Sequence, residues 1–230
     1  MFRWAHAVAA VVTVALSGCQ PGVAAPTLPP TPADAPSVLM PWAGQPEPDF
    51  APGPLLDRDG APLLLIAPSD RPWARHLAEL LRTEGFTTFD VAPTSTPQAL
   101  SRARIILVGA GAAGDGDVEA LRRASEAGAD VLLVRPEGAL AQLAGLEVIG
   151  EQAEGVLVRP ERLPLQVHGR SVLYRLVGAT TRAELRAELT GAALGPAVSV
   201  RRIEGGGRIV AFAFDPAEAV VKTRQGNPEW

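Results

Sequence analysis

The sequence predicts an α/β domain in which an open, mainly parallel β-sheet lies between two layers of helices and ends in an antiparallel C-terminal meander. Two short apolar runs, Ile105–Val108 and Val131–Val134, flank an amphipathic segment at Val118–Glu126. Two buried strands joined by a helix form a βαβ unit, and such a unit requires a parallel sheet covered on both faces. Beyond Gly150 several strand-like stretches follow, with a hairpin signal at Gly205–Gly207, which indicates antiparallel strands.

The elements before this unit follow from burial patterns and helix signals. Leu63–Ile66 is a compact apolar run and predicts the first, central strand. A helix is expected from Arg71 to Thr83, because Asp70 can cap it and Gly85 can end it. The remaining expectations for this part of the chain are Pro72 in the first turn, a buried stripe of Trp73, Leu77, Leu80 and Leu81, a strand at Thr87–Val91 and a polar crossover with one helical turn at Thr94–Ala103.

The C-terminal half predicts one further helix and several strands. Ala139–Leu143 is expected to form a short helix that Gly145 ends. The expected strands are Leu163–Val167, Val172–Val177, Ala197–Ile203 and Arg208–Phe214. Ala183–Leu189 stays ambiguous, because its residues favour a helix while its neighbours are strands.

The N-terminus has the pattern of a secretory signal peptide. Arg3 supplies a positive charge, Ala7–Leu16 is an uncharged apolar run of about ten residues, and small residues follow. This run is too short to span a bilayer as a stable helix. Residues 1–18 are therefore expected to be removed from the mature protein.

The end of this segment, Leu16-Ser17-Gly18-Cys19, resembles the lipobox of bacterial lipoproteins. The resemblance implies cleavage before Cys19, acylation of its thiol with chains such as palmitate, and a lipid anchor that holds the protein on a membrane of the bacterial cell envelope, outside the cytoplasm. Cys19 is the only cysteine, so neither a disulfide nor a thiol nucleophile would remain. The alternative is an ordinary signal peptide that has a cysteine near its end.

Residues 19–60 predict an extended tether between the anchor and a domain at residues 61–230. Half of the 22 prolines lie in this segment, and its charges sum to −4. The apolar residues Val38–Trp42 and Phe50 either pin its end onto the domain or remain in the spacer. The domain carries 20 acidic and 19 basic residues, so no broad positive field would hold nucleic acid.

The order of these elements, together with the closing stretch from Gly207 to Val221 and the motif Arg224-Gln-Gly-Asn-Pro, resembles a class I glutamine-amidotransferase-like domain, which is flavodoxin-like. The version it most resembles stands ahead of a polysaccharide-deacetylase-like region in larger secreted bacterial proteins. The resemblance covers roughly Trp42 to Trp230. Nothing in this sequence resembles the deacetylase metal site, so the resemblance implies a member without that activity.

The sequence offers few residues for catalysis. An active class I amidotransferase needs a cysteine on the turn after the third strand, where this chain has glycine and alanine, and no G-x-S-x-G motif supplies a serine instead. His76 and His168 are interpreted as solvated or structural side chains. No metal-ligand cluster has a recognised spacing. We therefore expect neither a catalytic residue nor a bound metal or cofactor.

One glycine motif leaves an alternative open. Gly109-Ala-Gly111-Ala-Ala-Gly114 follows a strand and precedes a helix, a pattern typical of dinucleotide binding. It lies on the third strand rather than the first, and Asp115 at the helix start would repel a pyrophosphate. Arg135 stands where a ribose-binding acid is expected, although an arginine accepts the 2′-phosphate of NADP. The competing interpretation is a plain glycine-rich turn capped by Asp115.

In an open α/β sheet the ligand cleft lies beyond the carboxyl ends of the strands. The residues expected there are Ser69, Asp70, Arg71, Gly109, Gly111, Arg135, Glu137 and Asp215. A cluster of Asp70, Arg71 and Arg135 would hold a sugar or a carboxylate, or would consist only of helix caps and ion pairs.

The leading hypothesis is a non-catalytic, lipid-anchored accessory protein of the bacterial envelope that binds a glycan or a partner protein. The alternatives are a carbohydrate-active hydrolase or deacetylase, and an NADP-binding domain.

Overall fold

A computed structural model describes residues 61–152, 156–159 and 165–225 of the protein. The predicted signal peptide at 1–18, the predicted lipidation site Cys19, the proline-rich segment to residue 60 and the C-terminal residues 226–230 lie outside these ranges. None of the helices in the described ranges has the length and apolar character needed to span a bilayer.

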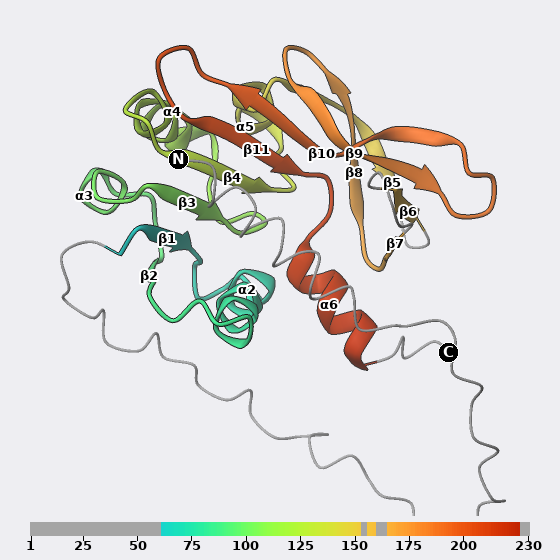
Figure 1. Cartoon of the computed structure of the whole chain (residues 1–230), viewed down its shortest axis with the longest axis horizontal. Coiled ribbons are helices and arrows are strands. Elements are labelled where there is room, and N and C mark those ends of the chain that lie inside the picture. The colour runs from blue at the N-terminus through green and yellow to red at the C-terminus, as the bar shows by residue number, and fades with distance from the viewer. Residues whose placement is uncertain (1–60, 153–155, 160–164, 226–230) are drawn as a thin grey trace, which may run out of the picture.

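The main sheet has nine strands within the described residues, in the order β2-β1-β3-β4-β11-β10-β9-β6-β7 (Figure 1). Its first five strands are parallel to one another: β2 (Asp90–Ala92), β1 (Leu63–Ile66), β3 (Ile105–Val108), β4 (Asp130–Val134) and β11 (Arg208–Phe212). All four residues of β1 are buried, as expected for a strand covered on both faces. The chain leaves β1 toward β2 on one side and reaches β3 on the other, so the topological switch point lies between β1 and β3.

Helices cover both faces of the parallel strands and give the molecule three layers (Figure 1). α2 (Pro72–Thr83) and α6 (Pro216–Gln225) contact each other and share one apolar core with the sheet. α3 (Pro97–Leu100), α4 (Val118–Glu126) and α5 (Gly138–Leu143) enclose a second core on the opposite face. Each core is built from alternate residues of the same strands, because successive strand side chains point to opposite faces. The predicted three-layer α/β fold class is therefore confirmed.

The rest of the chain is antiparallel. β10 (Ala193–Arg202) pairs with β11 and β9 (Thr180–Ala187), and β6 (Val156–Arg159) then joins β9 to β7 (Leu165–Val167). β5 (Leu146–Gln152) and β8 (Ser171–Leu176) form a separate two-stranded sheet. β9 resolves the ambiguous stretch as a strand, because Leu185 packs into the core of the sheet and its register is set by β10.

The strand expected at Arg208–Phe214 forms the predicted antiparallel hairpin with β10, but on its other side β11 is parallel to β4, which was not expected. A long-range contact explains its position. The backbone amide of Gly207 donates to the carbonyl of Ser125 near the end of α4, at 2.7 Å. A side chain on Gly206 or Gly207 would collide with the backbone of residues 125–129. The glycines therefore let the turn lie directly against the end of α4, and this contact places β11 beside β4.

Three other elements, α2, β2 and α6, also differ from expectation. Asp70 does not cap α2; the capping position is Arg71, which makes no side-chain cap bond, and Pro72 begins the helix with no amide to satisfy. The second strand begins at Asp90 rather than at Thr87. α6 was not predicted, although Asp215-Pro216 is a helix-start signal: the Asp215 carboxylate accepts from the amides of Ala217 and Glu218, at 2.9 and 3.3 Å.

Candidate functional site

The switch point between β1 and β3 is closed by packing. Gly109 is buried, and a Cβ atom there would lie 2.5 Å from the Cβ of Ala74 in α2. Gly111 has a φ of +65°, and the guanidinium of Arg71 lies about 3.6 Å from where its Cβ would be. Asp70 pairs with Arg71 at 3.8 Å, with both side chains more than half exposed. Helix α2 therefore packs directly on the turn after β3, at the place where the fold predicts a crevice.

The glycine-rich turn also uses its own polar groups. The amide of Gly114 donates to the Asp117 carboxylate at 2.8 Å, and the Asp115 carboxylate accepts from the amide of Ala139 at 3.1 Å. Asp115 thus bonds the first turn of α5 rather than capping the helix that follows it. Two carboxylates at this turn repel a pyrophosphate, and the bonded Gly114 amide is not available to one. The geometry therefore does not favour dinucleotide binding.

Arg135, one strand further along the same edge, is unusual in its backbone and its side chain. Its φ of +49° makes it the one non-glycine residue with a positive φ in the described ranges. Its side chain is 16% exposed, and the nearest carboxylates belong to Glu151 at 3.6 Å and Glu218 at 4.0 Å. Its Nε atom is buried without a hydrogen-bond partner among the described residues. A residue held in a strained conformation with an unpaired buried donor is a candidate for ligand contact.

The left-handed turn at Arg135 also reshapes the edge of the sheet. The Arg135 amide still donates to the carbonyl of Phe212 at 2.8 Å, but beyond this bond β8 replaces β4 as the neighbour of the β11 segment. Val172 donates to the carbonyl of Ala213 at 2.7 Å, and Ser171 pairs with Phe214. Arg135 and Ser171 therefore flank the same stretch of backbone.

A buried tyrosine secures this turn. The hydroxyl of Tyr174 donates to the carbonyl of Pro136 at 2.7 Å. Burial raises the pKa of Tyr174, and the nearby Glu137 carboxylate adds to this effect, so the hydroxyl keeps its proton. The hydroxyl of Ser171, by contrast, is buried without a hydrogen-bond partner in the described part of the chain.

Two buried acids stand beside Arg135 at the start of α6. Asp215 is 2% exposed and Glu218 is 7% exposed. Burial raises the pKa of Asp215, and the Glu218 carboxylate raises it further. The two backbone amides that donate to Asp215 and the Arg135 guanidinium lower this pKa and offset part of the shift. Glu218 also pairs with Lys222 at 3.2 Å. Gly169 packs closely against it, because a Cβ atom on Gly169 would lie 2.6 Å from the Glu218 carboxylate carbon.

We call this group the Arg135 site. It consists of Arg135, Glu151, Arg170, Ser171, Asp215 and Glu218, with Arg170 paired to Glu151. Its acidic and basic side chains nearly balance, and two of its buried polar atoms have no partner among the described residues. Such a site suits a neutral polar ligand that offers hydroxyl groups, or an ordered water, better than it suits a strongly charged ligand. No group of three or more potential metal ligands occurs in the described residues.

The structure divides the residues that the sequence assigned to one cleft. Arg135 and Asp215 come together, whereas Ser69, Asp70, Arg71, Gly109 and Gly111 belong to the closed switch point. The predicted cluster of Asp70, Arg71 and Arg135 is divided accordingly, because the carboxylate partners of Arg135 are Glu151 and Glu218.

Other members of the Arg135 site were missed from the sequence. Glu151, Arg170 and Ser171 lie on or next to β5 and β8, where no motif marks them. Glu218 could have been found from the Asp215-Pro-Ala-Glu helix start. Of the two histidines discussed above, His76 is half-buried with Nδ1 2.9 Å from Glu79, consistent with a structural side chain.

The fold resembles part of several carbohydrate-active enzymes. The exo-β-1,4-mannosidase Op5Man5 from Opitutaceae bacterium strain TAV5 is 18% identical to this chain, with a TM-score of 0.56. The match covers 73% of this chain and 33% of the mannosidase. A β-galactosidase from Halorubrum lacusprofundi is 19% identical over 74% of this chain and 31% of its own, with a TM-score of 0.53. The α-L-fucosidase isoenzyme 2 from Paenibacillus thiaminolyticus is 13% identical over 73% of this chain and 33% of its own, with a TM-score of 0.51.

These structures are glycoside hydrolases, and the chain spans about a third of their length. At such low identity the likeness establishes a shared fold only. Neither a protein-family model nor a curated protein matches the sequence.

Proposed function

We propose that this chain is a lipid-anchored accessory protein of the bacterial cell envelope, in which an amidotransferase-like domain binds a glycan or a partner protein without catalysing a reaction. Binding takes place at the Arg135 site. The lipid on Cys19 holds the protein on a membrane outside the cytoplasm, and residues 20–60 form the tether.

The binding role rests on one observation, the combination of a strained backbone and a buried, unpaired Nε at Arg135 among the described residues. A strained backbone places a mostly buried guanidinium between two carboxylates that lie 3.6 and 4.0 Å away, and its Nε has no partner among the described residues. Groups of this kind donate to sugar hydroxyls while the neighbouring carboxylates accept from them. The glycoside hydrolases that share this fold support a carbohydrate ligand in preference to other neutral polar molecules.

A glycan-binding experiment tests the role directly. The full chain carrying Cys19→Ala, applied to a glycan array and to purified peptidoglycan, should bind a defined subset of glycans. Arg135→Gln should lose at least about tenfold in affinity, because a buried hydrogen bond to a charged group contributes about 1.5–3 kcal/mol. Arg182→Gln, the same change on an exposed residue of β9, is the charge-matched control. Equal binding by both variants would contradict a role for the site.

The lipid anchor has its own test. Cells that express the chain and are fed a labelled fatty acid should label the wild type, and the protein should fractionate with membranes. Cys19→Ala should lose both properties, because no other thiol exists in the sequence. Label that persists in Cys19→Ala would refute the anchor and leave the binding proposal standing.

One observation favours a second candidate, a carbohydrate-active hydrolase. Asp215 and Glu218 are buried acids at one site, and burial raises the pKa of Asp215, as a general acid requires. Hydrolysis of chromogenic glycosides or acetylated glycans that disappears in both Asp215→Asn and Glu218→Gln would establish this alternative. Turnover unaffected by either change would exclude these acids as its catalysts.

A further inference from the structure

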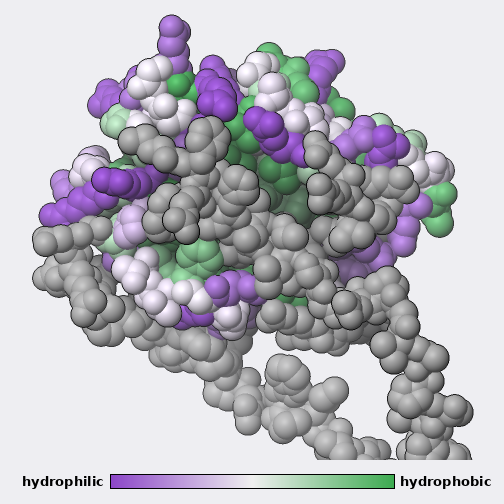
Figure 2. Space-filling model, viewed as in Figure 1, coloured by the Kyte–Doolittle hydropathy of each residue, from purple (hydrophilic) through white to green (hydrophobic). Residues whose placement is uncertain are grey.

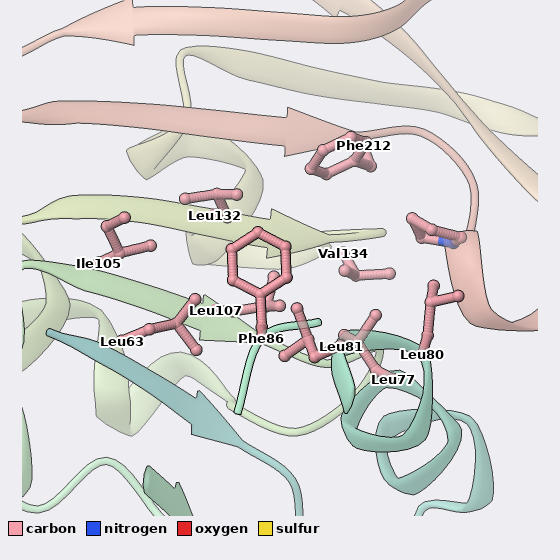
Figure 3. Close-up of a pocket in the computed structure, with 11 residues that line it drawn as sticks. Leu63, Leu77, Leu80, Leu81, Phe86, Ile105, Leu107, Leu132, Val134 and Phe212 are labelled. Carbon is pink, nitrogen blue, oxygen red and sulfur yellow. The ribbon is translucent and has the colours of Figure 1, made fainter. Parts of the chain in front are cut away.

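A small apolar cavity lies between α2 and the parallel strands (Figure 3). Leu77, Phe86 and Leu107 are among its lining residues, all of which are apolar, and its volume is about 40 Å³. A cavity that binds benzene measures about 150 Å³. The cavity is therefore a packing gap in the core, and a further binding partner has to be sought at the surface.

Exposed apolar side chains gather on the two-stranded sheet of β5 and β8. Figure 2 shows one face of the molecule, on which patches of apolar surface (green) lie among hydrophilic residues (purple). The large apolar residues that are exposed in the described ranges are Val148, Ile149, Leu176, Val177 and Leu189. The first four lie on β5, on β8 or directly after β8, and these two strands pair with each other. A cluster of apolar side chains left in water is typical of an interaction surface.

The outer edge of β5 is free in the described part of the chain, where β5 pairs only with β8. Tyr174, which pairs with Val148, turns its backbone away from β5: its carbonyl oxygen lies 2.7 Å from where a Cβ atom on Gly195 of β10 would stand. In an antiparallel pair of this kind, both residues direct their amides and carbonyls outward. Val148 therefore presents its amide and carbonyl to the free edge.

The same geometry recurs at the other end of β5. Val172, which pairs with Glu151, donates its amide away from β5, to the carbonyl of Ala213 at 2.7 Å. Glu151 therefore also directs its backbone groups to the free edge. A strand edge with outward amides and carbonyls is a template for a further strand.

The charges along this edge indicate which strand fits. Glu147 and Glu151 lie on β5 itself, whereas Arg175 and Arg170, which pair with them, lie on β8 or directly before it. An approaching strand would thus meet the two carboxylates before the arginines. Basic residues four positions apart in that strand would stand opposite the two acids and attract them.

A second copy of the chain fits this edge less well. Antiparallel pairing of two β5 strands around Ile149 would set Glu147 of one chain opposite Glu151 of the other. Like charges directly opposite each other destabilise a sheet. The edge therefore favours a different chain, with basic residues at these positions.

We propose that the free edge of β5 is a docking site for a partner protein, which adds an extended segment to the two-stranded sheet. The segment places apolar residues opposite Val148 and Ile149 and a basic residue on either side of them. Main-chain hydrogen bonds hold such a segment, and its side chains give specificity. The docking site shares Glu151 with the Arg135 site, but it binds a polypeptide backbone and does not depend on glycan binding at Arg135.

A synthetic peptide tests the proposal on the full chain carrying Cys19→Ala. The probe is a fluorescein-labelled form of the peptide Thr-Lys-Thr-Val-Val-Lys-Thr, whose lysines are four positions apart. It should bind in fluorescence anisotropy titrations. Replacing both lysines by glutamate should weaken binding at least about tenfold, because carboxylates would then face Glu147 and Glu151. Methylating the peptide amides that face β5 should weaken it by a similar factor, because the main-chain donors are lost.

Val148→Lys supplies the protein side of the test. A lysine on an edge strand opposes strand addition and repels a basic segment, so this variant should bind the peptide at least about tenfold more weakly. Leu189→Lys is the matched control, because Leu189 is 98% exposed and lies between β9 and β10, away from this edge. It should bind as the wild type does, and circular dichroism should show that both variants are folded.

Amide hydrogen exchange measured by NMR reports the contact directly. The Val148 amide should exchange at least about tenfold more slowly when the peptide is saturating. The Val177 amide, which donates to the carbonyl of Gly145 at 2.8 Å, should be protected with and without peptide. Failure of the peptide to bind, or binding without protection at Val148, would overturn the proposal. Protection of Val148 that grows with protein concentration in the absence of peptide would also overturn it, by assigning the edge to a second copy.

Discussion

The turns after β3 and β4 lie side by side at the carboxyl edge of the sheet, yet they differ in chemistry. After β3, Gly109 lies buried beneath Ala74 of α2, and Arg71 occupies the space beside Gly111. After β4, Arg135 adopts a left-handed conformation and pairs with the buried Glu218, near the buried Asp215. The order of strands marks where a crevice can form, but the packing of a single helix decides whether it stays open.

The largest effect is expected where the edge is closed. Gly109→Ala should destabilise the protein by about 2–3 kcal/mol, because the new methyl group would stand 2.5 Å from the Cβ of Ala74 and α2 would have to shift. Gly114→Ala, in the same turn but with no atom within 4 Å, should change stability by about 0.5 kcal/mol or less. Urea denaturation of both variants measures the difference. Equal effects would mean that the turn is not held by α2.

The Arg135 site should show a smaller penalty for crowding. Gly169 and Gly178 have similar positive φ values of +104° and +115°, but only at Gly169 would a methyl group meet another residue, the Glu218 carboxylate. Gly169→Ala should therefore cost about 1–2 kcal/mol more than Gly178→Ala, which reports the backbone strain alone. Denaturation midpoints of the pair isolate the contact. A Gly169→Ala variant as stable as Gly178→Ala would show that Glu218 moves aside freely.

The strain at Arg135 can be separated from its charge. Arg135→Ala and Arg135→Gly both remove the guanidinium, but only glycine adopts a φ of +49° without steric cost. Arg135→Gly should be more stable than Arg135→Ala by about 1 kcal/mol, the reverse of the usual order of these residues within a helix or strand. Chemical denaturation measures this difference. An alanine variant that is the more stable would indicate that the turn relaxes once the side chain is lost.

The smallest effect concerns pH. Because burial raises the pKa of Asp215 in the folded protein, the folded state binds its proton more tightly than the unfolded state does. Stability from this group is therefore lost as pH rises through the interval between the unfolded and folded pKa values, and acidification recovers it.

Asp215→Asn keeps an oxygen that can cap α6 and removes the titration. Its stability relative to wild type should be highest at about pH 7 and should decline by about 1 kcal/mol or less as pH falls toward about 4, the ordinary pKa of an aspartate. Thermal unfolding across this range provides the measurement. A constant difference between the two proteins would mean that Asp215 titrates alike in both states.

The sequence alone determined those strands and helices whose apolar residues follow a clear pattern within a single short segment. Ile105–Val108 and Val118–Glu126 have the predicted boundaries, and Leu63–Ile66 is a buried strand, because period and apolar run length report directly on which faces are covered. The fold class followed from these elements, since two buried strands joined by a helix permit few arrangements. The sequence also placed Arg135 and Asp215 at one edge of the sheet.

Only the tertiary structure decided which residues meet there. Gly206 and Gly207 bring β11 beside β4 through contacts with α4, and α2 closes the switch point above Gly109. Glu151 reaches Arg135 from a two-stranded sheet that no local pattern predicted to lie there. Such contacts join residues far apart in the chain, and their geometry depends on how whole elements pack, which the periodicity of a single segment does not record.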